Sequence, residues 1–169
     1  AGNSVLSEGL WYKMKIESDG IYRVDKAFLE ENGIDPNTVN PNKVNIYGNT
    51  GDQLPIDNSV FRHDDLVVNP TFFNGNTDSD WDNGEYLLFY GDGANSWEFD
   101  PSDSGMYFNL EKHSYSNVGY YFLRLDDMSQ VRISDGVTPG GTADYNSTEF
   151  DDFFLYETES VNLVKSGRE

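Results

Sequence analysis

The sequence predicts a mainly β protein: an antiparallel β-sandwich or jelly-roll-like single domain over residues 1–169, with one short helix near residues 25–33. Aromatic residues make up 15% of the chain, and they favour the half-buried surfaces of strands. The 16 glycines, with frequent Asn and Asp, supply turns between short apolar runs. A chain of 169 residues is long enough to bury one core of its own.

The first strands are expected near the N-terminus. Residues 10–16 alternate between two faces, which places Tyr12, Met14 and Ile16 together. Asp19-Gly20 follows, and such a pair between apolar runs is typical of a hairpin turn. We therefore expect residues 21–24 to return as the second strand of a hairpin.

The predicted helix begins after Asp25, whose side chain can cap its free amides. Phe28 and Leu29 supply an apolar edge, and Gly33 can end the helix in the left-handed conformation. Further strands are expected at residues 43–47, 66–68, 85–90, 106–110, 120–125 and 153–157. Residues 134–148 are rich in Gly, Thr, Asp and Ser and predict a loop. We find no internal repeat and no second domain.

Composition excludes several classes of function. The chain has 11 basic and 30 acidic residues, a net charge of −19. This surface should repel nucleic acid and anionic lipid, and its natural complements are divalent cations or a basic partner. The absence of cysteine removes thiol catalysis, disulfides and cysteine-bound metals from this chain. No apolar run approaches the roughly 18 residues of a membrane span, so we expect no direct membrane insertion.

The acidic stretch at residues 78–85 is a candidate metal site. Its aspartates at every second position match the first three ligand positions of a calcium loop. The helix–loop–helix type is excluded, because its sixth and twelfth positions require Gly and Glu where this chain has Asn83 and Phe89. An irregular calcium cage remains one interpretation, with Asp78, Asp80, Asp82 and Glu85 as ligands. The other is a solvated acidic turn that leads into a buried strand.

Other candidate motifs favour structural roles. His63-Asp64-Asp65 could supply a base or a ligand, yet a surface loop is the simpler interpretation. Residues 90–96 resemble a phosphate-binding glycine loop, but the third glycine is missing and a strand-ending turn fits better. In the aromatic pairs Phe72-Phe73, Tyr120-Tyr121 and Phe153-Phe154, one ring of each should be core and the other could stack on sugars.

Four segments in order resemble one family. They are WYK at 11–13 with SDGIYR at 18–23, VNIYGN at 44–49, DNGEYLLFYG at 82–91 and VNLVKSGRE at 161–169. Together they are similar to the N-terminal region of the PorU sortases of the type IX secretion system, which are large gingipain-like cysteine peptidases. The resemblance runs from about Ser4 to Glu169. It favours structure over metal for the acidic stretch, since the segment like 82–90 is a turn entering a core strand in that family.

The resemblance implies a non-catalytic, prodomain-like module on the outer membrane surface of a Gram-negative bacterium. The parent enzyme would remove C-terminal sorting signals from secreted cargo, with its catalytic His and Cys downstream. We expect Ser166, Gly167, Arg168 and Glu169 to link to that peptidase region. Its partners would be the peptidase domain and outer-membrane components of the secretion machine, with no catalytic residue and no required cofactor in this chain. The alternative is a free-standing carbohydrate-binding β-sandwich with a structural calcium.

Overall fold

The structure is a computed structural model that describes residues 4–76, 78–99, 108–134, 136, 140 and 145–149. Within these ranges it confirms the mainly β prediction, with nine strands and one α-helix. The strands are β1 (Trp11–Ile16), β2 (Gly20–Asp25), β3 (Asn45–Tyr47), β4 (Val68–Asn69), β5 (Thr71–Asn74), β6 (Tyr86–Gly91), β7 (Ser96–Phe99), β8 (Phe108–Glu111) and β9 (Gly119–Arg124). The helices are α1 (Lys26–Glu31) and three 3-10 turns at Val5–Ser7, Pro36–Thr38 and Pro41–Lys43.

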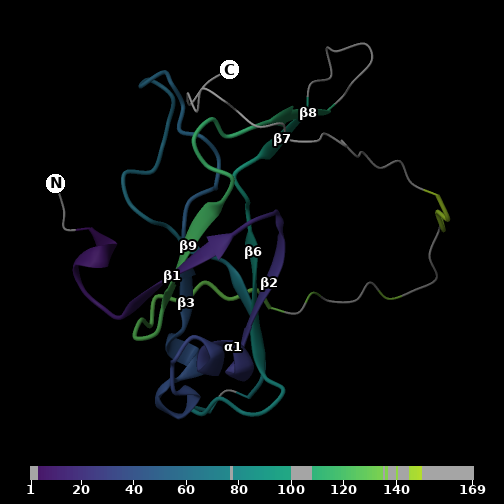
Figure 1. Ribbon diagram of the computed structural model, residues 1–169. Coiled ribbons are helices and arrows are strands. Elements are labelled where there is room, and N and C mark those ends of the chain that lie inside the picture. The colour runs from purple at the N-terminus through teal and green to yellow at the C-terminus, as the bar shows by residue number, and fades with distance from the viewer. Residues whose placement is uncertain are drawn as a thin grey trace.

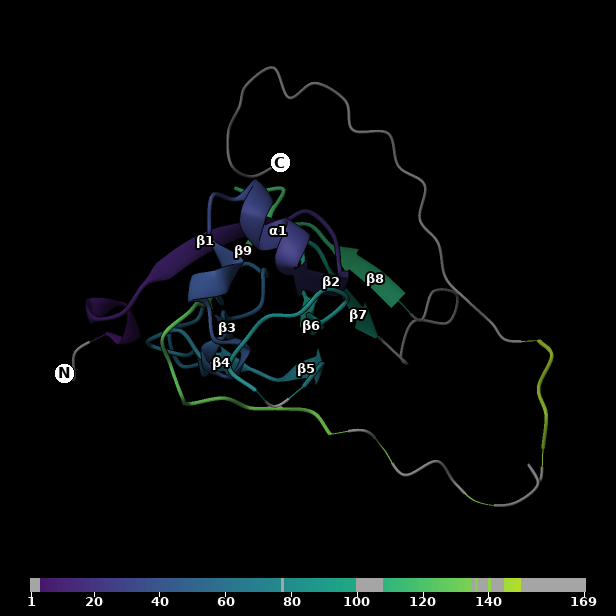
Figure 2. The same cartoon turned by 90° about the horizontal axis from the view of Figure 1, so that it is seen from below.

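Two antiparallel sheets form the body of the molecule. Sheet A has the strand order β1-β9-β3-β4 and sheet B the order β2-β6-β5, while β7 and β8 pair with each other. Seen from below, the strands of the two sheets lie in two neighbouring rows (Figure 2). Side chains from both sheets share one core, and the rings of Phe89 and Tyr121 meet across it with centroids 5.7 Å apart.

The predicted hairpin at Asp19-Gly20 is wrong, although both of its strands exist. β1 pairs with β9 and β2 pairs with β6, so the two strands belong to different sheets. The turn carries the chain from one layer to the other. It is held there because the Asp19 carboxylate accepts the amide N–H of Gly93 at 2.7 Å. The Asp-Gly pair therefore predicted the turn correctly, but it did not predict which strand pairs with β1 or with β2.

The predicted helix is confirmed, from the Asp25 cap to the glycine that ends it. The Asp25 carboxylate accepts the amide N–H of Phe28 at 2.9 Å, which satisfies a free amide of the first turn. Leu29 is fully buried. Gly33 follows with φ of 74°, the left-handed conformation that a residue without Cβ adopts at low cost.

The other strand predictions fared unevenly. Residues 43–47, 85–90 and 120–125 correspond to β3, β6 and β9, and residues 66–68 and 106–110 overlap β4 and β8. The short strands β5 and β7 were not predicted. The predicted strand at 153–157 lies outside the described residues.

The two ends of the sandwich differ in construction (Figure 1). The α1 end comprises residues 26–44 and the loop 75–85, and it buries Leu29, Ile34, Val39, Val44 and Trp81 in the core cluster. The distal end comprises residues 17–19, the loop 49–66 and the turns 91–95 and 112–118. In the described chain, exposed large apolar side chains occur at the distal end, in the N-terminal segment, on outward sheet faces and in the segment after β9, but not among residues 26–44 and 75–85.

Candidate interaction surface

Glu85, a candidate calcium ligand, serves the backbone of its own loop. Only 6% of this residue is exposed, and its two carboxylate oxygens accept the amide N–H groups of Asn76 at 2.5 Å and Asp82 at 3.0 Å. Trp81, 3% exposed, lies beside it and points its indole N–H at the Glu85 carbonyl. The Glu85 carboxylate therefore closes the loop by hydrogen bonds to its backbone.

The other three candidate ligands lie on the surface. Asp78, Asp80 and Asp82 are exposed, and the Asp78 carboxylate accepts the amide N–H of Asp80 at 3.2 Å. Within the ranges that the structure describes, no three His, Cys, Asp or Glu side chains gather in a way that could hold a metal ion. Calcium binding by Asp78, Asp80, Asp82 and Glu85 stays a prediction.

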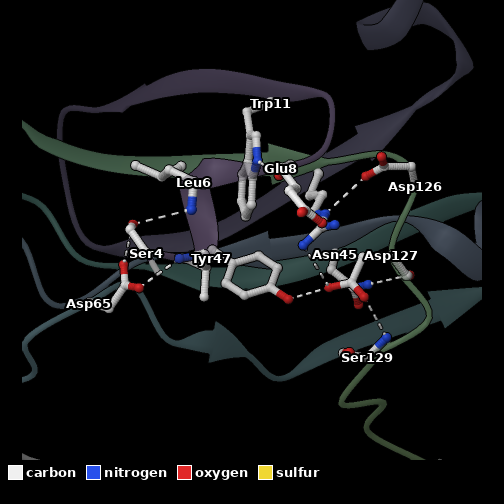
Figure 3. Close-up of polar contacts among 12 residues, drawn as sticks. Ser4, Leu6, Glu8, Trp11, Asn45, Tyr47, Asp65, Asp126, Asp127 and Ser129 are labelled. Atoms are coloured by element: carbon white, nitrogen blue, oxygen red, sulfur yellow. Dashed lines mark hydrogen bonds and ion pairs between the residues drawn. The ribbon is translucent and has the colours of Figure 1, made fainter. Parts of the chain in front are cut away.

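The His63-Asp64-Asp65 motif lies in the loop 49–66, where its third residue is an anchor. The Asp65 carboxylate accepts the amide N–H of Val5 at 2.7 Å and of Leu66 at 2.8 Å. Those hydrogen bonds, led by the one from Val5, lower the pKa of Asp65. Asp65 therefore ties the N-terminal segment to the loop (Figure 3).

Three segments cross at the distal end, where glycines of the loop 49–66 and of β9 lie against the turn 91–95. A Cβ on Gly51 would lie 1.8 Å from the carbonyl oxygen of Gly93, and one on Gly119 would lie 2.4 Å from that of Asp92. Only glycine permits such an approach of backbone to backbone. The strand-ending turn predicted for residues 90–96 is thus packed against Gly51 and Gly119, and a Cβ on its own Gly93 would lie 3.1 Å from the Cα of Ser18.

A polar network on the outer face of sheet A gathers several ionisable groups (Figure 3). The Tyr47 hydroxyl donates to the Asp127 carboxylate, which also accepts the amide N–H of Ser129 at 2.9 Å. Burial first, and then the hydrogen bond to Asp127, raise the pKa of Tyr47 to about 12. Burial by itself would raise the pKa of Asp127, but the hydrogen bonds from Tyr47 and Ser129 outweigh it and lower that pKa.

The same network packs aromatic rings around a guanidinium. Arg124 lies over the indole of Trp11 at 5.1 Å and donates to Asp126 at 2.9 Å, and the Trp11 ring meets that of Tyr47 edge-on at 5.0 Å. The Trp11 indole N–H donates to the carbonyl of Glu8 at 2.7 Å. Each of these polar groups has an internal partner, so the network joins the N-terminal segment, β1, β3 and the chain after β9 as a structural unit.

The aromatic pairs divide as their strands dictate. Tyr121 is 2% exposed and Tyr120 is 44% exposed, which confirms one core ring and one surface ring. The Tyr120 ring already carries the Lys13 ammonium 3.6 Å from its centroid, so that face is occupied. Phe72 and Phe73 are both half-buried, and Phe153-Phe154 lies outside the described residues.

Sequence reasoning missed an apolar surface on sheet B. In β6, Leu87 and Phe89 face the core, so Tyr86, Leu88 and Tyr90 point outward. The strand register places β2 and β5 residues beside them on the same side. We call this surface the β6 face; it comprises Ile21, Arg23, Phe72, Tyr86, Leu88 and Tyr90.

The β6 face opens toward the distal end. Tyr86, Leu88 and Phe72 are half-buried, whereas Ile21 is 73% and Tyr90 56% exposed. Ile21 and Tyr90 stand directly opposite each other in the ladder between β2 and β6. Arg23 lies over the Tyr86 ring at 4.5 Å and pairs with Asp25 at 2.9 Å, which covers the end nearest α1. The signal for this surface was present in the sequence as an unbroken apolar run over 86–90.

These features define a small β-sandwich module with an acidic surface and one apolar sheet face. Among solved structures, the chain is similar to dimeric latent PorU from Porphyromonas gingivalis, with a TM-score of 0.58 and 28% sequence identity. The match covers 83% of this chain but only 12% of the PorU chain, and it supports a PorU-like relationship. No protein-family model and no curated protein matches the sequence. None of the helices described is long and apolar enough to cross a membrane.

Proposed function

We propose that this chain is the non-catalytic N-terminal domain of a PorU-like sortase, a cysteine endopeptidase that removes the C-terminal sorting signals of secreted cargo. The domain would scaffold, chaperone or inhibit the catalytic region that follows it. The observation that carries this proposal is the similarity to PorU over 83% of the chain, at a share of only 12% of the PorU length.

The chemistry of the chain agrees with an accessory role. A cysteine peptidase needs a thiolate nucleophile, and this sequence has no cysteine. The buried ionisable groups Glu85 and Asp127 are both hydrogen-bonded to backbone amides or to Tyr47, so their proton-accepting oxygens are engaged in the fold. The nucleophile and its base would belong to the region that follows.

The proposal extends to partners and place. The catalytic region would be the first partner, reached through Ser166, Gly167, Arg168 and Glu169, which lie outside the described residues. Outer-membrane components of the secretion machine would be further partners, and the domain would work on the outer membrane surface.

The decisive experiment begins with the native gene product. We expect a polypeptide several times longer than 169 residues, with a Cys and a His beyond Glu169. Deleting the domain should then abolish removal of cargo sorting signals, measured by mass spectrometry of secreted cargo C-termini. A native product of about this length, or intact processing after the deletion, would contradict the proposal.

A further inference from the structure

We propose that the β6 face is the surface through which this domain docks onto the rest of its own polypeptide, against an apolar patch rimmed by Lys and Arg. This inference rests on the proposed function and adds to it the location and chemistry of the contact. It is argued from the register of sheet B, from exposure and from charge.

The composition of β6 is that of a strand covered on both sides. Its first five residues, Tyr-Leu-Leu-Phe-Tyr, are all apolar or aromatic, whereas a strand with one wet face alternates with polar residues. In the described part of this chain only one side is covered, by the core around Leu87 and Phe89. The outward side exposes Tyr90 by 56% and the neighbouring Ile21 by 73%. A second surface from elsewhere would complete the burial that this pattern favours.

The face is also organised for binding. Its backbone is fixed by the ladders of β2 and β5 on β6, so covering it requires little ordering of the chain. Tyr and Arg are the side chains most enriched among residues that dominate binding energy, and both are present. The loop 49–66 exposes apolar residues too, among them Phe61 at 80%, but residues 54–61 form no strand or helix and would lose more conformational entropy on binding.

The charges around the face specify the partner. At the exposed end, partial burial and the nearby carboxylates of Asp19 and Asp92 raise the pKa of Tyr90. At the other end, Asp25 already holds Arg23. Asp19 and Asp92 lie directly beyond Gly20 and Gly91, the last pair of the ladder between β2 and β6, so the exposed end of the face is acidic. Because the domain also has a net charge of −19, a complementary surface is apolar at its centre and basic where it meets that end.

The test is photo-crosslinking in the full-length protein. A photoreactive phenylalanine analogue replaces Tyr90, and its matched control replaces Tyr115, which is 73% exposed at the distal end. We expect position 90, and not position 115, to crosslink within the same polypeptide to residues beyond 169. Crosslinks from position 90 to a second copy, or none at all, would overturn the inference.

A binding measurement separates this inference from the proposed function. Chain 1–169 is titrated onto the remainder of the polypeptide; Ile21→Arg and Tyr90→Arg should each weaken binding at least tenfold, and Tyr115→Arg less than twofold. If the wild-type chain fails to bind, the proposed function fails. If it binds and the two β6-face variants bind equally well, the inference fails while the proposed function stands. Circular dichroism of each variant checks that the sheet is intact.

Discussion

The two ends of the sandwich use the same kinds of residue for different purposes. At the α1 end, carboxylates and amides are bound to backbone groups: Asp25 caps α1, Glu85 closes its loop, and Asp35 and Asn40 cap the two 3-10 turns. Arg132 joins them by donating to the carbonyls of Pro41 and Val44 at 3.0 and 2.9 Å. At the distal end, Asp19 and Asp65 anchor the loops, while large apolar side chains face outward.

This difference separates what the domain needs in order to fold from what it offers to a partner. Residues 26–44 and 75–85 of the α1 end hydrogen-bond their capping and loop-closing groups and expose no large apolar side chain in the described chain, although Val131 and Ile133, which flank Arg132, are 43% and 53% exposed. The distal end and the adjoining part of the β6 face are anchored but leave Ile21, Phe61 and Tyr90 exposed. Substitutions should therefore affect stability at one end and association at the other.

The largest contrast is expected between two aromatic truncations. Trp81→Ala at the α1 end removes a ring that is 3% exposed and packs edge-on against Phe73. It should cost about 3–5 kcal/mol of unfolding free energy. Phe61→Ala, at an 80% exposed position of the distal loop, should change it by less than about 0.5 kcal/mol. Urea unfolding followed by circular dichroism measures both; equal losses would contradict the division between the ends.

A second test concerns the anchoring of the distal end. Gly51→Ala places a Cβ 1.8 Å from the Gly93 carbonyl oxygen, so one of the crossing segments must shift. We expect a loss of about 3 kcal/mol in the free energy of unfolding. Gly20→Ala is the matched control, because nothing lies within 4 Å of the added methyl group. If both variants melt alike, the glycine crossing is not what holds the distal loop.

Local patterns in the sequence were enough to predict α1, although not the 3-10 turns Pro36–Thr38 and Pro41–Lys43 that follow it. The cap at Asp25, the apolar edge and the terminal Gly33 each act within a few residues, so α1 was predicted with its cap and its end. The alternation of residues 10–16 likewise identified β1 and its core face, with Ile16 at 2% exposure. Helix capping and strand propensity depend on residues that are close in the sequence, so they can be predicted without knowing the fold.

Strand pairing and side-chain burial could not be predicted from local patterns. The Asp19-Gly20 turn has identical local chemistry whether the next strand returns in the same sheet or crosses to the other, because the choice depends on β6 and β9 far along the chain. Glu85 is a plausible calcium ligand in the sequence; its engagement by the amides of Asn76 and Asp82 follows from how the loop folds. The β6 run indicated a buried strand but not which of its faces the chain itself would cover.

A smaller effect tests the role of Glu85 directly. In Glu85→Gln one oxygen becomes an NH₂ group, so one of the two loop amides loses its acceptor, at a cost of about 1–2 kcal/mol. If Glu85 serves the backbone, thermal melting should show the same loss in excess Ca²⁺ and in EDTA. If the predicted calcium site forms, Ca²⁺ should stabilise the wild-type chain, by about 2.7 kcal/mol at a hundred times its dissociation constant, and the variant much less. Glu31→Gln, the same substitution at an exposed acid of α1, is the control for charge alone.

The smallest expected effect is a pH-dependent increase in the free energy of unfolding when Asp92, at the distal end, is replaced by Asn. Partial burial first, and then the carboxylates of Asp19 and Asp52, raise the pKa of Asp92 above its ordinary value near 3.8, against the opposing hydrogen bond from the Tyr121 hydroxyl at 3.0 Å. A raised folded-state pKa means that the protonated form is favoured by folding, so this contribution is present below pH 3.8 and is lost as pH rises through the folded value. At neutral pH the ionised group should therefore destabilise the fold.

Asp92→Asn keeps an acceptor for Tyr121 and should stabilise by a few tenths of a kcal/mol at pH 7, roughly the worth of a partly exposed charge interaction. The gain should shrink as pH falls toward 4, in melting curves taken at matched ionic strength. A stability gain that does not change with pH would mean that packing, and not the charge of Asp92, causes it. The ionised Asp92 would then not explain an acidic edge that favours a basic partner.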